Sequence, residues 1–210
     1  MRKPMRFKIV VYMLSCLERE ELRLRTIANL QAAGYVEEPR VEIDQMTFER
    51  RQERIEQTAR RLLQRAITEV SESDIILFLE DDLEFNRHLL HNLGRWYPLV
   101  NARPSGHFFG SLYNPNIRTL SRSPEEAFFV ADPEAVYGSQ AVLLSVATAR
   151  HIIERWEEVP GMQDIKMPRL AARVCPLYFH TPSLAQHVGY TSLWDGHYHW
   201  AEDFSADWRA

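Results

Sequence analysis

The stretch Asp74-Ile75-Ile76-Leu77-Phe78-Leu79-Glu80-Asp81-Asp82 decides the fold, because a continuous apolar run is followed at once by three carboxylates. An uninterrupted apolar run of this kind is typical of a strand that is covered on both faces. Three adjacent carboxylates at the end of such a strand repel one another close to a low-dielectric interior. A divalent cation would relieve that repulsion, and carboxylate oxygens suit Mg²⁺ or Mn²⁺. The stretch therefore predicts a metal site at the carboxyl end of a buried strand, where ligands of open α/β sheets bind.

A competing interpretation of the same residues needs no metal. Asp82 or Glu84 can lie near the start of the following helix, where negative charge is favoured by the helix dipole. A simple turn, however, needs only one of these acids, so the cluster favours the metal site.

The segments on either side alternate between strand-like and helix-like patterns. Strands are expected at residues 7–13, 41–44, 74–79, 107–112 and 141–145. Helices are expected at residues 20–33, 47–70 with Thr47 as the cap, 86–98 with Asn86 as the cap, and 147–156. Pro160-Gly161 then opens a short segment that contains Asp164 and Pro168. Alternating strands and helices predict one α/β sandwich with a mainly parallel sheet, spanning residues 1–210.

Composition and charge narrow the classes of protein. The chain has 210 residues, of which 45% are hydrophobic, and can bury one substantial core. Its formal charge of −4 gives no overall attraction to polyanions and makes a nucleic-acid partner unlikely. Cys16 and Cys175 have no disulfide or metal-type spacing, which favours a reducing cytoplasm. The apolar run from Phe7 to Leu14 is interrupted by Lys8 and predicts a strand rather than a membrane helix.

The helix expected at 47–70 has one apolar stripe and one strongly basic face. That face carries Arg50, Arg51, Arg54, Arg60, Arg61 and Arg65. Glutamates lie between these arginines, so a solvated face with internal ion pairs is the favoured interpretation, and a binding surface is the alternative.

Four segments resemble parts of one family of enzymes and occur in the same order along the chain. Residues 74–85 resemble the strand and DxD metal motif of glycosyltransferases with the GT-A fold. Met13-Leu14-Ser15-Cys16 followed by Arg19 resembles their first nucleotide-contacting strand and loop. Tyr137-Gly138-Ser139-Gln140-Ala141 resembles their donor-side segment. Pro182-Ser183-Leu184-Ala185-Gln186-His187-Val188-Gly189 resembles the SLxQHxG stretch of the N-acetylglucosaminyltransferase IV family.

The resemblance implies a Rossmann-like, three-layer GT-A sandwich that binds a nucleotide sugar. Residues 182–210 would form an irregular C-terminal segment that closes the active site. Unlike the animal enzymes, the chain is short, with no membrane anchor or stem expected, which leaves the acceptor open.

The resemblance also implies roles for particular residues. Asp82 would be the principal metal ligand and His187 the second, while Glu80 and Asp81 would contact the ribose or support the metal. An imidazole among oxygen ligands suits Mn²⁺ better than Mg²⁺. Ser15, Cys16 and Arg19 would contact the nucleotide, and Gly138, Ser139 and Gln140 the donor sugar. The alternatives are a structural histidine at 187 and a simple turn before a strand at 138–140.

An inverting transfer needs a carboxylate that accepts the proton of the attacking hydroxyl. Asp164 is the preferred candidate, because related enzymes place an acid in this region, and a helix-capping aspartate is the alternative. Asp132 and Asp195 are weaker candidates for the base. Trp194 is a candidate for stacking on an acceptor ring, and Arg118 is an alternative to Arg19 for contacting phosphate.

The sequence thus predicts a metal-dependent glycosyltransferase that moves GlcNAc or another hexose from a UDP-sugar to a hydroxyl of a glycan or other acceptor. A nucleotidyltransferase is the alternative enzyme, but the loop Ser15–Arg19 has no glycine for phosphate binding. A catalytically inactive nucleotide-sugar-binding module and an enzyme that glycosylates nucleic acid are the remaining alternatives.

Overall fold

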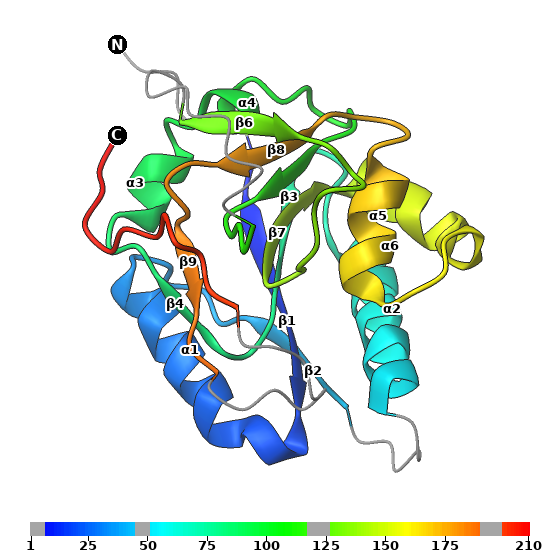
Figure 1. Cartoon of the computed structure of the whole chain (residues 1–210), viewed down its shortest axis with the longest axis horizontal. Coiled ribbons are helices and arrows are strands. Elements are labelled where there is room, and N and C mark those ends of the chain that lie inside the picture. Colours follow the sequence, from blue (N-terminus) through cyan, green and yellow to red (C-terminus); the bar gives the residue numbers. More distant parts are fainter. Residues whose placement is uncertain (1–6, 45–50, 117–126, 190–198) are drawn as a thin grey trace.

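The computed structural model describes residues 7–44, 51–116, 127–189 and 199–210, and a seven-stranded sheet with helices on both sides lies at its centre (Figure 1). The strands are β1 Ile9–Cys16, β2 Arg40–Asp44, β3 Ile75–Leu79, β4 Leu83–Phe85, β5 Phe109–Ser111, β6 Phe128–Ala131, β7 Ala141–Ser145, β8 Leu177–His180 and β9 Ala185–His187. The helices are α1 Glu20–Ala32, α2 Arg51–Glu69, α3 Leu89–Leu93, α4 Tyr97–Val100, α5 Val146–Glu154 and α6 Gln163–Ala171, with short 3₁₀ helices at Leu17–Arg19 and Trp156–Glu158.

The order of strands in the main sheet is β2-β1-β3-β7-β5-β8-β6. β1 is parallel to both β2 and β3, and β5 is parallel to β8. β7 is antiparallel to β3 and β5, and β6 is antiparallel to β8. Only β7 and β6 therefore run against the other strands of this sheet. The predicted α/β class is confirmed, and the sheet is mixed, with most of its strands parallel.

The central strands are buried on both faces, as the apolar runs predict. In β3 the side chains of Ile76 and Phe78 belong to one hydrophobic core, and those of Ile75, Leu77 and Leu79 belong to the other. Successive side chains of a strand point to opposite faces, so a strand between two helical layers must be apolar at every position.

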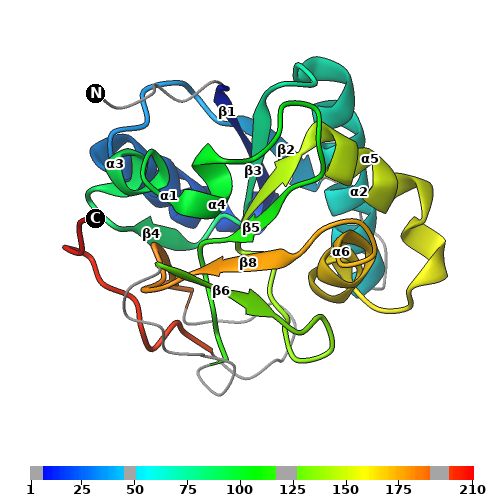
Figure 2. The same cartoon turned by 90° about the horizontal axis from the view of Figure 1, so that it is seen from above.

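Each hydrophobic core lies between the sheet and one layer of helices. Helices α2, α5 and α6 pack against each other over one face. Helices α1, α3 and α4 cover the other face, together with a two-stranded ribbon of β4 and β9 (Figure 2).

The basic face of α2 is paired with acids, as the solvated-face interpretation predicts. Arg54 makes an ion pair with Asp44 at 2.7 Å, and Arg65 one with Glu69 at 2.8 Å. Arg60 reaches Glu157 at 2.6 Å. The positive charge of this helix is therefore largely compensated within the protein.

Two predictions about the chain need correction. The single helix expected at 86–98 is two short helices, α3 and α4, because Trp96 adopts an extended conformation and Pro98 lies in the first turn of a new helix. Proline is favoured there, since its missing N–H would have no partner in any case. The segment 182–210 is not wholly irregular, because β9 pairs with β4 in antiparallel register.

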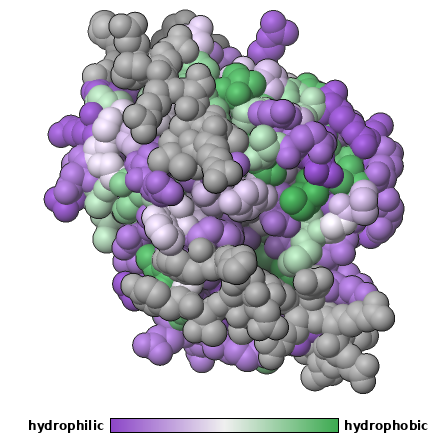
Figure 3. All heavy atoms as spheres, viewed as in Figure 1, coloured by the Kyte–Doolittle hydropathy of each residue, from purple (hydrophilic) through white to green (hydrophobic). Residues whose placement is uncertain are grey.

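On the face shown in Figure 3, hydrophilic residues predominate and hydrophobic ones appear as separate groups. Within the described ranges, none of the helices combines the length and the apolar character needed to cross a membrane.

Candidate functional site

Three sequence segments meet at one edge of the sheet because of the strand directions. Parallel β1 and β3 end side by side, which places Ser15 and Cys16 next to the acidic cluster Glu80-Asp81-Asp82. β7 runs in the opposite direction and begins at the same edge, with Ala141 opposite Leu79. The segment Gly138-Ser139-Gln140 therefore lies beside the acidic cluster. This is the carboxyl edge of the parallel strands, where α/β proteins bind ligands.

Arg19 and Ser15 hold Asp81 and Asp82 in place on the β1 side. The Arg19 guanidinium donates to Asp81 Oδ1 at 3.0 Å and to Asp82 Oδ2 at 2.5 Å. The Ser15 hydroxyl donates to Asp81 Oδ2 at 2.7 Å, and Arg23 donates to Ser15 Oγ at 3.1 Å. Both carboxylates are almost fully buried, with 3% and 1% of their surface exposed. The single positive charge of Arg19 is thus shared between two buried carboxylates.

The C-terminal segment supplies the partner of Asp82 on the other side. Pairing of β9 with β4 sets His187 opposite Leu83, so that its Nε2 lies 3.0 Å from Asp82 Oδ2. The backbone N–H of Val188 donates to the carbonyl of Asp82 at 2.9 Å. Gly189 lies so close that an added Cβ would be 2.5 Å from Asp82 Oδ2. A glycine at this position is what lets the segment approach the carboxylate.

Asp82 Oδ1 has no hydrogen-bond partner in the described part of the chain, although it is fully buried. A buried carboxylate oxygen without a partner is costly, and it marks a place where a cation or a water can bind.

Glu80 has different neighbours from the two aspartates. The Ser139 hydroxyl donates to Glu80 Oε1 at 2.7 Å, and the Glu80 N–H donates to the carbonyl of Gln140 at 2.9 Å. Gly138 precedes them with a φ of 96°, a conformation that glycine adopts without strain. The structure therefore brings the predicted donor-side segment into direct contact with the acidic cluster.

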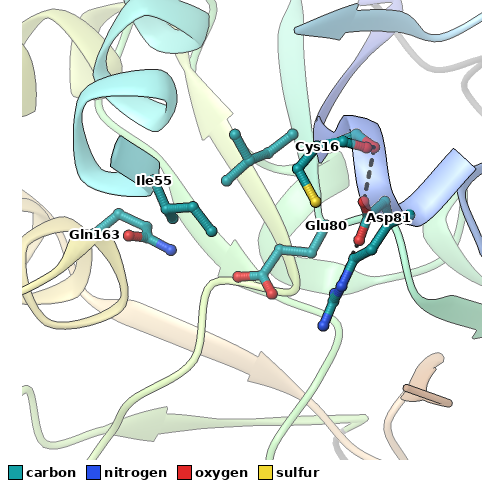
Figure 4. A pocket seen from close by; sticks show the side chains of 8 residues that line it. Cys16, Ile55, Glu80, Asp81 and Gln163 are labelled. Atoms are coloured by element: carbon teal, nitrogen blue, oxygen red, sulfur yellow. Dashed lines mark hydrogen bonds and ion pairs between the residues drawn. The ribbon is translucent and has the colours of Figure 1, made fainter. Parts of the chain in front are cut away.

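A small pocket of about 30 Å³ lies between this edge and the ends of α2 and α6. Figure 4 shows the Glu80 carboxyl group at its centre, with Cys16 on one side and Gln163 and Ile55 on the other. The lining side chains are Leu14, Ser15, Cys16, Arg19, Ile55, Glu80, Asp81 and Gln163. The predicted nucleotide-contacting residues Ser15, Cys16 and Arg19 thus share one pocket with Glu80 and Asp81.

The three carboxyl groups have different pKa values because their surroundings differ. Burial and the charge of Asp82 raise the pKa of Glu80 to about 7. Burial also raises the pKa of Asp81, against the opposing effect of Arg19 and Ser15. Burial works to raise the pKa of Asp82 as well, but the hydrogen bond and charge of His187 and the charge of Arg19 outweigh it, and the pKa is lowered.

The pKa of His187 is raised, whereas that of its partner Asp82 is lowered. Burial would lower it, but the hydrogen bond to Asp82 and the charge of that carboxylate raise the pKa overall. Burial raises the pKa of the Cys16 thiol to about 11, so this side chain lines the pocket as a neutral thiol.

The predicted metal ligands are only partly brought together. Asp82 and His187 are in direct contact, whereas Glu80 is bound to Ser139 and acts on His187 through its charge. Among the described residues, no group of three or more His, Cys, Asp and Glu side chains is arranged to hold a metal ion. Any cation at Asp82 would therefore need further ligands from outside the described side chains.

Asp164, the predicted base, is the second residue of α6, next to Gln163 in the pocket wall. Its carboxyl group lies close enough to Glu80 for its charge to raise the Glu80 pKa, and burial raises the pKa of Asp164 itself. Asp132 is exposed and accepts a hydrogen bond from the backbone N–H of Glu134. The predictions that concern Thr47, Arg118, Trp194 and Asp195 fall outside the described residues.

Two residues of the site were not predicted. His199 accepts at its carbonyl from His187 Nδ1 at 3.1 Å and from the Tyr113 hydroxyl at 3.0 Å, which fixes the orientation of the His187 ring. Gln163 lines the pocket from α6. His199 belongs to the His197-Tyr198-His199 run, but nothing in the spacing links it to His187, and Gln163 follows no recognisable motif.

Comparison with known protein families finds no family model that matches the chain. Among curated proteins, none matches it closely enough to count as a relative. The residues gathered at this edge of the sheet are therefore what indicates a function.

Proposed function

We propose that the protein is a metal-dependent glycosyltransferase that uses a UDP-sugar as donor and transfers GlcNAc or another hexose to a hydroxyl of a glycan or other acceptor. The observation that carries the proposal is the state of Asp82. Its carboxylate lies buried at the carboxyl end of β3, with one oxygen between Arg19 and His187 and the other without a partner among the described residues. A simple acidic turn does not need a buried carboxylate of this kind.

The donor set fits a divalent cation that is shared with a substrate. Asp82 supplies a hard oxygen, and His187 supplies an imidazole nitrogen that His199 and Tyr113 hold in place. One imidazole among oxygen ligands suits Mn²⁺, and Mg²⁺ is the alternative. Two protein ligands leave positions for phosphate oxygens and water, and a cation bound there would neutralise the diphosphate leaving group.

The other residues of the site then have distinct tasks. Arg19 lies beside both aspartates, where its planar guanidinium can bind phosphate once a cation takes over part of its charge-balancing role. Glu80, Ser139 and Gln140 are the candidates for contacting the donor. Asp164 is the candidate for accepting the proton of the attacking hydroxyl in an inverting transfer, because its raised pKa favours proton uptake.

A nucleotidyltransferase is the less favoured alternative. The loop after β1 is a short 3₁₀ helix without glycine, and it presents Arg19 to carboxylates rather than a row of backbone N–H groups to phosphates. A module that binds nucleotide sugars without turnover has the same site geometry, and only turnover distinguishes it from an enzyme.

Thermal unfolding tests the donor site. Ligands that bind only the native state raise its melting temperature. When each of two ligands strengthens the binding of the other, the shift with both exceeds the sum of the two single shifts. We expect Mn²⁺ and UDP together to produce a larger shift than the sum of the two single shifts. Asp82→Asn should abolish this extra shift while keeping the shape of the side chain. Asp207→Asn, which removes an exposed carboxylate paired with Arg87, is the control that should retain it.

The absence of a shift with Mn²⁺ and any nucleoside diphosphate would overturn the proposed donor site. Hydrolysis of UDP-sugars in the presence of Mn²⁺ is the accompanying measurement, because water can replace an unidentified acceptor. A joint shift without any hydrolysis or transfer would identify a binding module instead of an enzyme.

A further inference from the structure

Lys166 is a buried charged residue to which the proposed reaction assigns no role. It is the fourth residue of α6, and only 4% of its surface is exposed. Its ammonium group lies 2.9 Å from Glu56 Oε1 of α2 and donates to the carbonyl of Trp156 at 2.9 Å. The Trp156 indole N–H donates to the same Glu56 oxygen at 3.0 Å. Lys166 thus joins α6 to α2 and to the 3₁₀ helix Trp156–Glu158, which lie beside it (Figure 1).

Apolar side chains already attach α6 to the rest of the protein. Met167, Leu170 and Ala171 of this helix are fully buried in the hydrophobic core. Taking an ammonium group out of water costs free energy, and apolar residues in place of a buried ion pair often leave a protein equally stable. Apolar packing is not directional, whereas an ammonium group between two fixed acceptors sets the position of the helix that carries it. A buried lysine at 166 is therefore better explained by the placement of α6 than by its stability.

Lys166 acts on the first turn of α6, where the candidate base lies. The backbone N–H groups of Ile165 and Lys166 donate to the carbonyl of Met162 at 3.1 and 3.0 Å and close this turn. Met162, which precedes the helix, makes no side-chain capping bond. Among the described residues of this turn, Lys166 is the one whose side chain forms an ion pair with another helix. The position of the turn therefore depends on Lys166.

The Asp164 carboxyl group moves with this turn. It accepts from the backbone N–H groups of Asp164 itself and of Ile165, which ties the carboxyl group to the start of the helix. Its charge reaches Glu80 of the acidic cluster. A displacement of about 1 Å between a catalytic group and its target can lower a rate about 100-fold. A reaction that uses Asp164 as the base is thus sensitive to the contact between Lys166 and Glu56.

We propose that Lys166, through Glu56 and Trp156, is a positioning residue that holds the Asp164 carboxyl group where it can take the proton of the attacking hydroxyl. This inference rests on the proposed function, which makes Asp164 the base. The described ion pairs of Lys166 are with Glu56 and Glu157, not with the acidic cluster. Its replacement should therefore leave the binding of Mn²⁺ and UDP intact.

The test compares Lys166→Met with the wild type, since methionine keeps much of the length of lysine but has no ammonium group. Hydrolysis, with Mn²⁺, of the UDP-sugar that the wild type cleaves fastest gives kcat and KM, with water in place of the acceptor. We expect kcat to fall roughly tenfold to hundredfold, while KM and the joint shift in melting temperature with Mn²⁺ and UDP stay the same. Hydrogen exchange at the amides of Ile165 and Lys166 should become faster, because the first turn is released. Lys8→Met, which changes an exposed lysine just before β1, is the matched control and should change none of these values.

A double variant separates positioning from stability. Lys166→Met combined with Glu56→Gln leaves no unpaired charge, and the glutamine oxygen can still accept from the Trp156 indole. We expect this variant to melt close to the wild type but to keep the low kcat. It also takes the place of the single variant if that one does not fold. A kcat that returns to the wild-type value together with the stability would show that Lys166 has a structural role only.

The outcomes distinguish this inference from the proposed function. An active wild type whose kcat is unchanged by Lys166→Met overturns the role of Lys166 and leaves the glycosyltransferase proposal standing. A variant that loses the joint shift with Mn²⁺ and UDP along with kcat also overturns it, because the change then reaches the donor site. A wild-type protein that hydrolyses no UDP-sugar with Mn²⁺ overturns both.

Discussion

At the scale of single residues, the three neighbouring carboxyl groups of the acidic cluster are held by three different sets of partners. Asp81 has Ser15 and Arg19, and Asp82 has Arg19 and His187. Glu80 receives a hydrogen bond from Ser139 and keeps a pKa of about 7. Environments that separate the pKa values of adjacent acids are common where acids have different tasks in one reaction.

Asp164→Asn separates donor binding from chemistry. The amide keeps the size of the carboxyl group but cannot accept a proton, so we expect glycosyl transfer or donor hydrolysis to fall by two to four orders of magnitude, roughly the contribution of a general base. The joint stabilisation by Mn²⁺ and UDP should be unchanged, because Asp164 is not among the residues proposed to bind them. A product assay measures the loss of transfer, and melting curves on the same preparation measure the joint stabilisation.

The matched control is Asp207→Asn, which changes an exposed aspartate that is paired with Arg87. It should leave the rate unchanged. If the Asp164→Asn variant retains full transfer, Asp164 is not the base, and its role is to stabilise the first turn of α6.

At the scale of elements, the ribbon of β4 and β9 connects the acidic cluster to the C-terminal tail. Gln186 of β9 fixes this connection with its side chain, which donates to the carbonyl of Ala201 at 3.0 Å and accepts from the N–H of Ala201 at 2.9 Å. These two bonds hold the tail where His199 contacts His187. Gln186 is thus a positioning residue for the imidazole that faces Asp82.

Gln186→Ala should therefore loosen the tail without removing any atom from the site itself. Two hydrogen bonds that are partly accessible to solvent are worth about 1–2 kcal/mol together, so the free energy of unfolding should fall by about that amount. The amide of Ala201 should also lose its protection from hydrogen exchange. Gln64→Ala, an exposed residue of α2, is the control for both measurements. Retained protection at Ala201 in Gln186→Ala would show that the tail is held by other contacts.

The elements that could be predicted from the sequence are those with a strong local pattern. β3, β7, α1 and the stripe of α2 follow directly from apolar runs or helical spacing. β4, β6, β8 and β9 were not predicted, because strands of three or four residues are too short to show a period unless, as at β5, they lie within a longer apolar run. Their existence depends on the partner strand, which lies far away in the sequence.

At the scale of the whole molecule, the site also combines parts that follow from local sequence patterns with parts that depend on distant residues. The acidic cluster and the loop after β1 lie together because they follow two parallel strands. Only a resemblance indicated the segment before β7, because a mainly parallel sheet does not predict that the antiparallel strand β7 begins at this edge. The pairing of Asp82 with His187 joins residues 105 positions apart, and only the resemblance of residues 182–189 to a known motif indicated it. Gln163 and His199 could not be found from the sequence, because packing of α6 and of the tail, rather than any motif, brings them to the site.

His180 couples the fold as a whole to pH. It ends β8, is 1% exposed, and lies between the rings of Trp96 and Trp208, the second of which belongs to the C-terminal tail. Its Nδ1–H donates to the carbonyl of Pro182 at 2.7 Å, while its Nε2 is buried without a partner in the described chain. Burial lowers the pKa of His180 from 6.5 to about 4.

The sign of the effect follows from proton binding. Between pH 6.5 and about 4 the unfolded chain binds a proton at this residue that the folded protein does not bind. Stability from the neutral imidazole is therefore complete above pH 6.5 and is lost as the pH falls toward 4. A difference of this size corresponds to about 3 kcal/mol. Glu80 contributes with the opposite sign, because its raised pKa favours the folded state as the pH falls. The free energy of unfolding of the wild type, followed against pH, therefore contains both effects.

A comparison with His180→Asn isolates the contribution of the histidine. The asparagine amide can donate to the carbonyl of Pro182 but does not titrate, so the variant should be less stable at neutral pH and should lose less stability on acidification. We expect the difference in free energy of unfolding between wild type and variant, measured with urea, to shrink by about 2–3 kcal/mol between about pH 7 and pH 4.5. His107→Asn, which changes an exposed histidine, should follow the wild-type profile in parallel. A constant difference between wild type and His180→Asn across this range would mean that His180 takes up its proton in the folded protein, and that the contact between β8 and the C-terminal tail opens to admit water.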